Sequence, residues 1–329
     1  MATFKAFYIT ENQDKTYSQE VIERDINDLP AGEVLIKVKY SSLNYKDALS
    51  SIGNRGVTRN YPHTPGIDAA GIVESSESDS FTVGEQVLVT GFDLGMNTAG
   101  GLGQYIRVPA QWVVKLPRGL RLKESMILGT AGLTAGLCID KLLQNGLKPE
   151  QGKVIVTGAT GGVGTMAVMI LARLGFDVVG VTGKPEGKEF LLSIGAKEVI
   201  AREAVNDQSG RPLLKGMYAG CVDTVGGNML ATILKSMQYN GVVAICGLVQ
   251  SPELPTSVFP FILRGVSMFG IDSSECAIEW RKQVWKKLAR KWKPANMQAI
   301  ARTVTLQGLP KEIKKILKGG QMGRVVVRL

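Results

Sequence analysis

The sequence predicts an α/β protein in which a doubly wound parallel sheet, wrapped by helices, is joined to a second, irregular β-rich domain. Three observations predict it. A glycine-rich turn within 154–164 separates a β-branched run from a segment with helical spacing. Strand-like and helix-like segments alternate after this turn. The first 115 residues, in contrast, contain only short strand patterns between glycines and prolines. Alternating strands and helices are typical of a parallel sheet covered by helices.

The N-terminal part is expected to be the β-rich domain. Apolar residues alternate from Val34 to Tyr40, which predicts a strand, and 69–75, 84–91 and 103–117 contain further short strands. From about Leu122 the spacing becomes helical, and this helical region leads into the strand before the glycine-rich turn.

The turn itself predicts a dinucleotide site. Val154 to Val156 form a short buried strand, and apolar residues recur at helical spacing from Val163 onward. Between them, Ala159 to Gly164 fit the pattern G-x-G-x-x-G with alanine in the first place. Glycines at these positions let a pyrophosphate approach the backbone at a helix N-terminus. The alternative is a tight turn without function, but the strand before it and the helix after it favour the phosphate site.

The end of the next strand, 177–181, favours NADP(H) over NAD(H). An NAD enzyme usually carries an acidic residue about twenty residues after the glycines, where it binds the ribose hydroxyls. This chain has Thr182, Gly183 and Lys184 instead, and Arg202 follows the next strand candidate, 198–200. A lysine, an arginine and a hydroxyl attract a 2′-phosphate, which a carboxylate would repel. The alternative is that both cations are ordinary surface residues.

The remaining strands are expected in 220–227, 241–248 and 264–272, which extends the alternation of strands and helices. A last strand candidate, 323–329, follows a helix predicted at 308–319. We expect this final strand to rejoin the first domain instead of extending the parallel sheet.

Composition excludes several classes of protein. There is no charged-then-apolar leader and no apolar run of membrane length, and the four cysteines form no C-x-x-C pair. We therefore expect a soluble, cytoplasmic protein with reduced thiols. The net charge of +10 is concentrated in 279–293. We interpret this segment as a surface helix with an apolar stripe at Trp280, Val284, Leu288 and Trp292. A funnel for anionic ligands and a nucleic-acid-binding patch are the alternatives.

The side chains for hydrolysis and for metal chemistry are missing. His63 is the only histidine, so a Ser-His-Asp site is not expected, and we interpret His63 as a packing residue. A catalytic zinc usually needs three protein ligands that include His or Cys, and a structural zinc needs four. No such set is visible, and no metal site is expected.

Several stretches together resemble the medium-chain dehydrogenase/reductase superfamily over the whole chain. These are 41–49, 65–71, 129–135, the glycine-rich turn and 260–267. They are similar to its zinc-free, quinone-oxidoreductase-like branch, specifically the NADPH-dependent acryloyl-CoA reductase group. Zinc-dependent members have Gly-His-Glu where this chain has Gly66, Ile67 and Asp68. The resemblance implies a GroES-like catalytic domain, residues 1–124 and 293–329, and an NADP-binding Rossmann domain, residues 125–292.

The resemblance also implies roles for individual residues. Tyr45 would contact the nicotinamide end of the cofactor and is the candidate catalytic residue, with Asn44 and Lys46 as weaker candidates. The implied cofactor-binding residues are Thr160, Gly161, Gly162 and Val163 at the pyrophosphate, Thr182, Gly183, Lys184 and Arg202 at the 2′-phosphate, and Leu248, Ile262 and Ser273 along the cofactor wall. Gly319 stands where similar proteins have asparagine, so a side-chain contact is not expected there.

The implied reaction is reduction of an α,β-unsaturated thioester, acryloyl-CoA, to propionyl-CoA by NADPH. A reductase of quinones or small enones, with the same fold and cofactor, is the first alternative. A nucleic-acid-binding protein with incidental reductase activity is a distant one, supported only by the basic charge. Related enzymes commonly form homodimers, which we expect here as well.

Overall fold

The computed structural model describes residues 3–329, which form two compact units. The first unit extends to Thr130 and also contains Ser274–Ala289 and Asn296–Leu329. The second comprises Ala131–Ser273 and Arg290–Ala295. The first unit is rich in antiparallel strands and the second is a parallel α/β unit, so the predicted fold class is confirmed.

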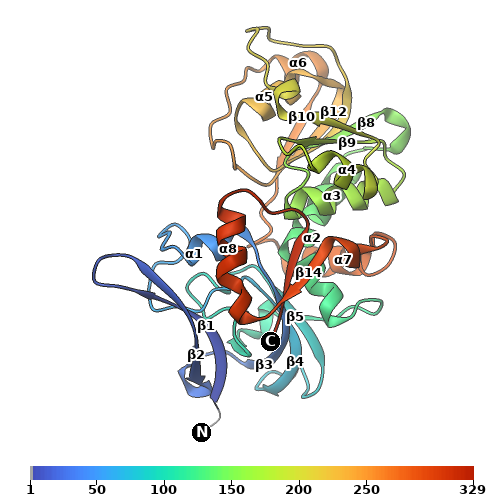
Figure 1. Ribbon diagram of the computed structural model, residues 1–329. Coiled ribbons are helices and arrows are strands. Elements are labelled where there is room, and N and C mark those ends of the chain that lie inside the picture. The colour runs from blue at the N-terminus through green and yellow to red at the C-terminus, as the bar shows by residue number, and fades with distance from the viewer. Residues whose placement is uncertain (1–2) are drawn as a thin grey trace. The chain divides into compact units, whose positions relative to one another are not determined.

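The first unit is built on a seven-stranded sheet with the order β14-β15-β3-β4-β5-β7, in which β6 also pairs with β3. Its strands are β3 (Val34–Ser42), β4 (Asp68–Ser76), β5 (Gln86–Thr90), β6 (Tyr105–Val108), β7 (Val114–Lys115), β14 (Ala301–Val304) and β15 (Arg324–Arg328). The final strand pairs antiparallel with β3, which confirms that the chain returns to the first domain. The sequence patterns did not reveal β14, or the antiparallel ribbon of β1 (Thr3–Glu11) and β2 (Tyr17–Asp25), drawn in dark blue in Figure 1.

Two short helices accompany this sheet, α1 (Tyr45–Ser50) directly after β3 and α8 (Leu309–Leu317) before β15, and they pack against each other. One apolar core lies beside them, and it contains Leu43 and Ala48 from the start of the chain with Leu309 and Ile313 from its end. Burial of these side chains therefore connects the N-terminal and C-terminal parts of the unit.

The second unit contains a six-stranded parallel sheet with the order β10-β9-β8-β11-β12-β13. Its strands are β8 (Lys153–Val156), β9 (Val178–Thr182), β10 (Glu198–Ala201), β11 (Tyr218–Asp223), β12 (Met237–Ile245) and β13 (Ser267–Gly270). The helices between them are α3 (Gly162–Arg173), α4 (Gly187–Ser193), α5 (Gly227–Lys235) and α6 (Phe259–Arg264), several of them visible against the sheet in Figure 1. The chain builds outward from β8 to β10 and then continues from β11 on the other side, so the sheet is doubly wound. The switch point lies between β8 and β11.

Helix α2 (Leu122–Gln144) carries the chain from the first unit into the second. Within residues 3–329 it is the one helix long and apolar enough to cross a membrane, but 83% of its most apolar window is buried inside the protein. It is therefore a core helix. Gly129 interrupts its helical geometry with φ +53° and ψ −157°, a conformation that favours glycine.

Helix α7 (Ile278–Leu288) corrects the interpretation of the basic segment. Arg281 and Trp285 both lie outside the apolar stripe expected in 279–293, yet both are fully buried. The Arg281 guanidinium donates to the backbone oxygens of Thr90 (2.5 Å) and Ser274 (2.8 Å) and lies 4.3 Å from the centre of the Phe92 ring. These contacts hold α7 in the first unit, whereas the predicted boundary placed it in the nucleotide-binding domain.

Candidate functional site

The glycine-rich turn lies between β8 and α3, at the carboxyl edge of the parallel sheet. Gly161 is the N-cap of α3 and no side chain caps the helix. The N–H groups of the first helical turn therefore have no partner within the helix. Gly161, Gly162 and Val163 are partly exposed, and Thr160 is buried beneath them. An uncapped helix N-terminus with accessible glycine backbone is the geometry that binds a pyrophosphate.

Gly164 lets α3 pack directly on the turn. A Cβ atom at this position would lie 2.4 Å from the backbone oxygen of Gly158 and 2.6 Å from Cα of Ala159. Gly158 has φ +55°, a left-handed conformation that favours glycine. The two glycines thus allow the helix to start immediately beside the strand end, as the fingerprint predicts.

The residues predicted to bind the 2′-phosphate meet at the ends of the adjacent strands β9 and β10. Thr182 Oγ1 accepts a hydrogen bond from Lys184 N at 3.1 Å. Gly183 lies against Arg202, since a Cβ atom at Gly183 would be 2.9 Å from Arg202 Cδ. The Arg202 side chain is 66% exposed and its Nε donates to Glu203 Oε1 at 3.0 Å. The hydroxyl of Thr182, the backbone of Gly183 and the guanidinium of Arg202 therefore lie together at the end of β9.

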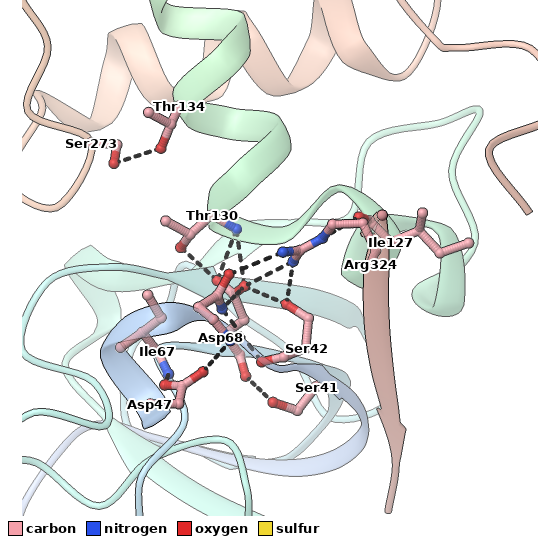
Figure 2. Close-up of polar contacts among 12 residues, drawn as sticks. Ser41, Ser42, Asp47, Ile67, Asp68, Ile127, Thr130, Thr134, Ser273 and Arg324 are labelled. Atoms are coloured by element: carbon pink, nitrogen blue, oxygen red, sulfur yellow. Dashed lines mark hydrogen bonds and ion pairs between the residues drawn. The ribbon is translucent and has the colours of Figure 1, made fainter. Parts of the chain in front are cut away.

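The residues implied for the cofactor wall lie on three separate segments. Leu248 follows β12 and Ser273 follows β13, so both lie beyond the carboxyl edge of the sheet. Ser273 Oγ accepts a hydrogen bond from Thr134 Oγ1 at 2.7 Å (Figure 2). Ile262 lies on α6 and is 69% exposed. Contact of these three residues with a cofactor stays a prediction.

In the first unit, Tyr45 begins helix α1 and is 49% exposed. Asn44 precedes it as the N-cap, and Asn44 N donates to Asp47 Oδ2 at 2.7 Å. The other carboxyl oxygen of Asp47 accepts from Ile67 N at 2.9 Å. Burial raises the pKa of Asp47 to about 7, and the nearby Asp68 carboxylate acts in the same direction. Asp47 thus fixes the start of α1 through both carboxyl oxygens.

A buried polar cluster is centred on Asp68, the first residue of β4 (Figure 2). The Asp68 carboxylate accepts hydrogen bonds from Ser42 Oγ (2.5 Å), Asn44 Nδ2 (2.7 Å), Thr130 Oγ1 (2.6 Å) and Thr130 N (2.9 Å). Gly129 leaves room for this cluster, because a Cβ atom there would lie 2.5 Å from Asp68 Oδ2. The four donors come from three segments, so Asp68 connects β3, the start of α1 and the break in α2.

Arg324, on β15, provides the positive charge of the cluster. Its Nη2 lies 3.9 Å from Asp68 Oδ2, and its Nε donates to the backbone oxygen of Ile127 at 3.0 Å. Its Nη1 donates to Asn44 Oδ1 at 3.2 Å. Burial lowers the pKa of Arg324, and the carboxylates of Asp68 and Asp47 oppose that shift. Both polar atoms of the Asn44 side chain are thus engaged, which fixes the residue immediately before Tyr45.

The side chains of Lys46 and His63 each contact other residues of the first unit. Lys46 Nζ donates to Ser274 Oγ at 3.0 Å. His63 is buried, and its Nε2 lies 3.0 Å from the backbone oxygen of Gly95. Burial lowers the pKa of His63, so it is neutral at physiological pH. Its burial and its contact with the backbone agree with the prediction that His63 is a packing residue.

Sequence reasoning missed the polar residues beside the candidate residues of each unit: Asp47, Asp68 and Arg324 in the first unit, and Thr157 with Asp223 in the second. Their signal was weak but present. Asp223 is a carboxylate at the end of an otherwise apolar strand pattern, and Asp68 precedes the apolar run of β4. A charged residue at such a position is expected to be buried only with partners.

Two family descriptions match the chain: "Alcohol dehydrogenase GroES-like domain" over residues 30–118 and "Zinc-binding dehydrogenase" over residues 162–290. The "Putative quinone oxidoreductase YhfP" of Bacillus subtilis is 46% identical and aligns over 99% of both chains. The "Acrylyl-CoA reductase AcuI" of Ruegeria pomeroyi is 43% identical over 98% of both. The solved structure of the yhdH oxidoreductase from Salmonella enterica, in complex with NADP, is 41% identical and superimposes with a TM-score of 0.96, covering 99% of both chains. The solved structure of Bacillus subtilis yhfP contains NAD and superimposes with a TM-score of 0.97 at 45% identity, covering 100% of both chains.

The zinc in the second description does not fit the residues present. Ile67 offers no ligand atom, and both oxygens of Asp68 already accept hydrogen bonds beside the Arg324 guanidinium. Among residues 3–329, no group of three or more His, Cys, Asp or Glu side chains is placed to hold a metal ion.

Proposed function

Because the chain belongs to the medium-chain dehydrogenase/reductase superfamily, we propose that it is an NADPH-dependent, metal-independent reductase of activated C=C bonds that converts acryloyl-CoA to propionyl-CoA. The relative named as an acrylyl-CoA reductase, 43% identical along nearly the whole chain, supports this substrate. The assignment of NADPH as the cofactor depends on the residues at the end of β9. There, Gly183 packs against the Arg202 side chain, and no acidic residue occupies 182–184.

Bound NADPH would supply the hydride for the β-carbon of the substrate. Negative charge then collects on the thioester oxygen, which needs a hydrogen-bond donor, and the α-carbon needs a proton. Tyr45 is the candidate for either task, because its side chain is half exposed on a helix start that Asn44 and Asp47 hold in place. Asn44 and Lys46 are weaker candidates, since their polar atoms already bond within the first unit. The alternative is that Tyr45 only positions the cofactor.

Replacing both Lys184 and Arg202 with alanine should raise KM for NADPH at least about tenfold more than KM for NADH, because only NADPH has the 2′-phosphate that these cations would bind. Initial rates with each cofactor measure the ratio. Lys197→Ala, at an exposed lysine elsewhere in the second unit, is the control and should leave the ratio unchanged. An unchanged ratio in the double variant would show that the two cations do not select NADPH.

Replacing Tyr45 with phenylalanine should lower kcat about 100-fold if its hydroxyl serves as acid or donor. KM for NADPH should change little, because the ring remains. Steady-state kinetics separate the two quantities. Tyr239→Phe, at a tyrosine that is 78% exposed in the second unit, is the matched control. Wild-type kcat in Tyr45→Phe would limit Tyr45 to positioning the cofactor.

The substrate is tested by following NADPH absorbance with acryloyl-CoA, crotonyl-CoA and a set of quinones. We expect the highest kcat/KM for acryloyl-CoA. The alternative, a quinone or enone reductase, is supported by the 46% identical relative named as a putative quinone oxidoreductase. Faster turnover of quinones than of either thioester would favour it. A homodimer stays a prediction.

A further inference from the structure

The switch point of the parallel sheet contains a buried carboxylate whose role the proposed reaction leaves open. Asp223 is the last residue of β11 and is fully buried. Thr157 is the first residue after β8, the strand next to β11. Ligands of doubly wound sheets bind in the crevice that opens between the two strands at the switch point. Asp223 and Thr157 therefore lie at the base of the crevice where the dinucleotide is expected.

Asp223 accepts hydrogen bonds from the turns that follow both β8 and β11. Its Oδ1 accepts a hydrogen bond from Thr157 Oγ1 at 2.7 Å. Its Oδ2 accepts from the backbone N–H groups of Gly226 (2.8 Å) and Val225 (3.3 Å). Burial raises the pKa of Asp223, and these three donors oppose that shift. The carboxylate is thus held by donors from the turn after β8 and from the turn after β11.

The backbone around Thr157 reinforces the connection. Thr157 Oγ1 accepts a hydrogen bond from Thr224 N at 2.9 Å. Thr224 Oγ1 in turn donates to the backbone oxygen of Thr157 at 3.0 Å. Gly158, the next residue of the glycine-rich turn, lies so close that a Cβ atom would be 2.3 Å from Thr224 Oγ1. The start of the glycine-rich turn therefore cannot move independently of the turn after β11.

The same segment also fixes the turn that carries Leu248. Cys246 N donates to the backbone oxygen of Asp223 at 2.9 Å. Gly247 packs on the backbone of Thr224, where a Cβ atom would lie 2.3 Å from the Thr224 oxygen. Residues 223–226 thus connect the turn expected to bind pyrophosphate with the turn expected to form the cofactor wall.

We propose that Asp223 is a positioning residue for the cofactor, which acts through Thr157 to hold the glycine-rich turn at the spacing that NADPH requires. This inference rests on the proposed function. The two carboxylate oxygens of Asp223 accept from all three donors at this site. Asparagine would present its NH₂ group to one of them, and valine at position 157 would remove the donor that faces Asp223.

The experiment measures the dissociation constants of NADPH and NADP⁺ by calorimetry for the wild-type protein and for Asp223→Asn, Thr157→Val and Thr157→Ser. We expect Asp223→Asn and Thr157→Val to bind both cofactors about tenfold or more weakly, because each loses a hydrogen bond to a buried charged group. Thr157→Ser keeps the hydroxyl and should bind nearly as well as wild type.

The variant Thr232→Val distinguishes a positioning role of Asp223 and Thr157 from a purely structural one. Thr232 is another buried threonine of the second unit, and its Oγ1 accepts from Asp207 N at 2.9 Å. This variant should lose stability without losing cofactor affinity. If wild type binds NADPH and Thr157→Val binds it equally tightly, the positioning role is wrong while the proposed function stands. If wild type binds neither cofactor, both are overturned. If Asp223→Asn fails to fold, the comparison of Thr157→Val with Thr157→Ser tests the positioning role.

Discussion

Replacing Arg324 with methionine is expected to lower the free energy of unfolding by about 3–5 kcal/mol, because the Asp68 carboxylate would remain buried without its cation. Asp68 is fully buried and Arg324 is 3% exposed, so water cannot take over the role of the guanidinium. The Ile127 oxygen and Asn44 Oδ1 would lose their donor in the same variant. Urea-induced equilibrium unfolding measures the change.

Arg328→Met is the matched control, since Arg328 lies on the same strand and is exposed. Its free energy of unfolding should stay within about 0.5 kcal/mol of wild type, as is usual for surface positions. A loss below about 1 kcal/mol for Arg324→Met would mean that the hydrogen bonds from Ser42, Asn44 and Thr130 stabilise the carboxylate without the guanidinium.

The Asp68 cluster also matters for chemistry, because it fixes Asn44 and with it the start of α1. Tyr45 follows directly in the chain, so its side chain projects from a backbone held on one side by Asn44 and on the other by the Asp47 cap. Catalytic groups act best when their supporting residues prevent displacements of even 1 Å. The buried charges of Asp68 and Arg324 thus fix the residue that precedes the proposed catalytic residue.

The features that the sequence predicted are those that local patterns determine. The strand, glycine turn and helix around Gly161 occupy consecutive residues, so spacing and composition were enough to predict them. The return of the final strand was predictable because 323–329 is a β-branched run that follows a helix and is separated from the parallel sheet. Its pairing with β3 confirms that prediction.

The features that the sequence did not reveal depend on contacts between distant residues. Asp68 and Arg324 are far apart in the chain, and neither has a neighbour that indicates burial with an opposite charge. Arg281 looked like one of many surface cations in a basic segment, yet it is buried under β5 and the Phe92 ring. No helical periodicity distinguishes a buried, hydrogen-bonded arginine from an exposed one.

Replacing Gly164 with alanine is expected to raise the dissociation constant of NADPH about ten- to a hundredfold. The added Cβ atom would lie 2.4 Å from the Gly158 oxygen and 2.6 Å from Cα of Ala159, and both are backbone atoms that cannot rotate away. Helix α3 must therefore move off the turn, at a cost of about 1–3 kcal/mol typical of overpacking. Its N–H groups would no longer converge with the turn on one pyrophosphate.

Gly270→Ala serves as the control for this variant. Gly270 ends β13 in the same unit, and a Cβ atom there meets nothing within 4 Å. Calorimetric titration with NADPH should give wild-type affinity for Gly270→Ala and weak binding for Gly164→Ala. Equal affinities would mean that α3 can shift without disturbing the phosphate site, or that the pyrophosphate does not bind at this turn. In either case, NADPH binding would not depend on the close packing of α3 against the turn that Gly164 allows.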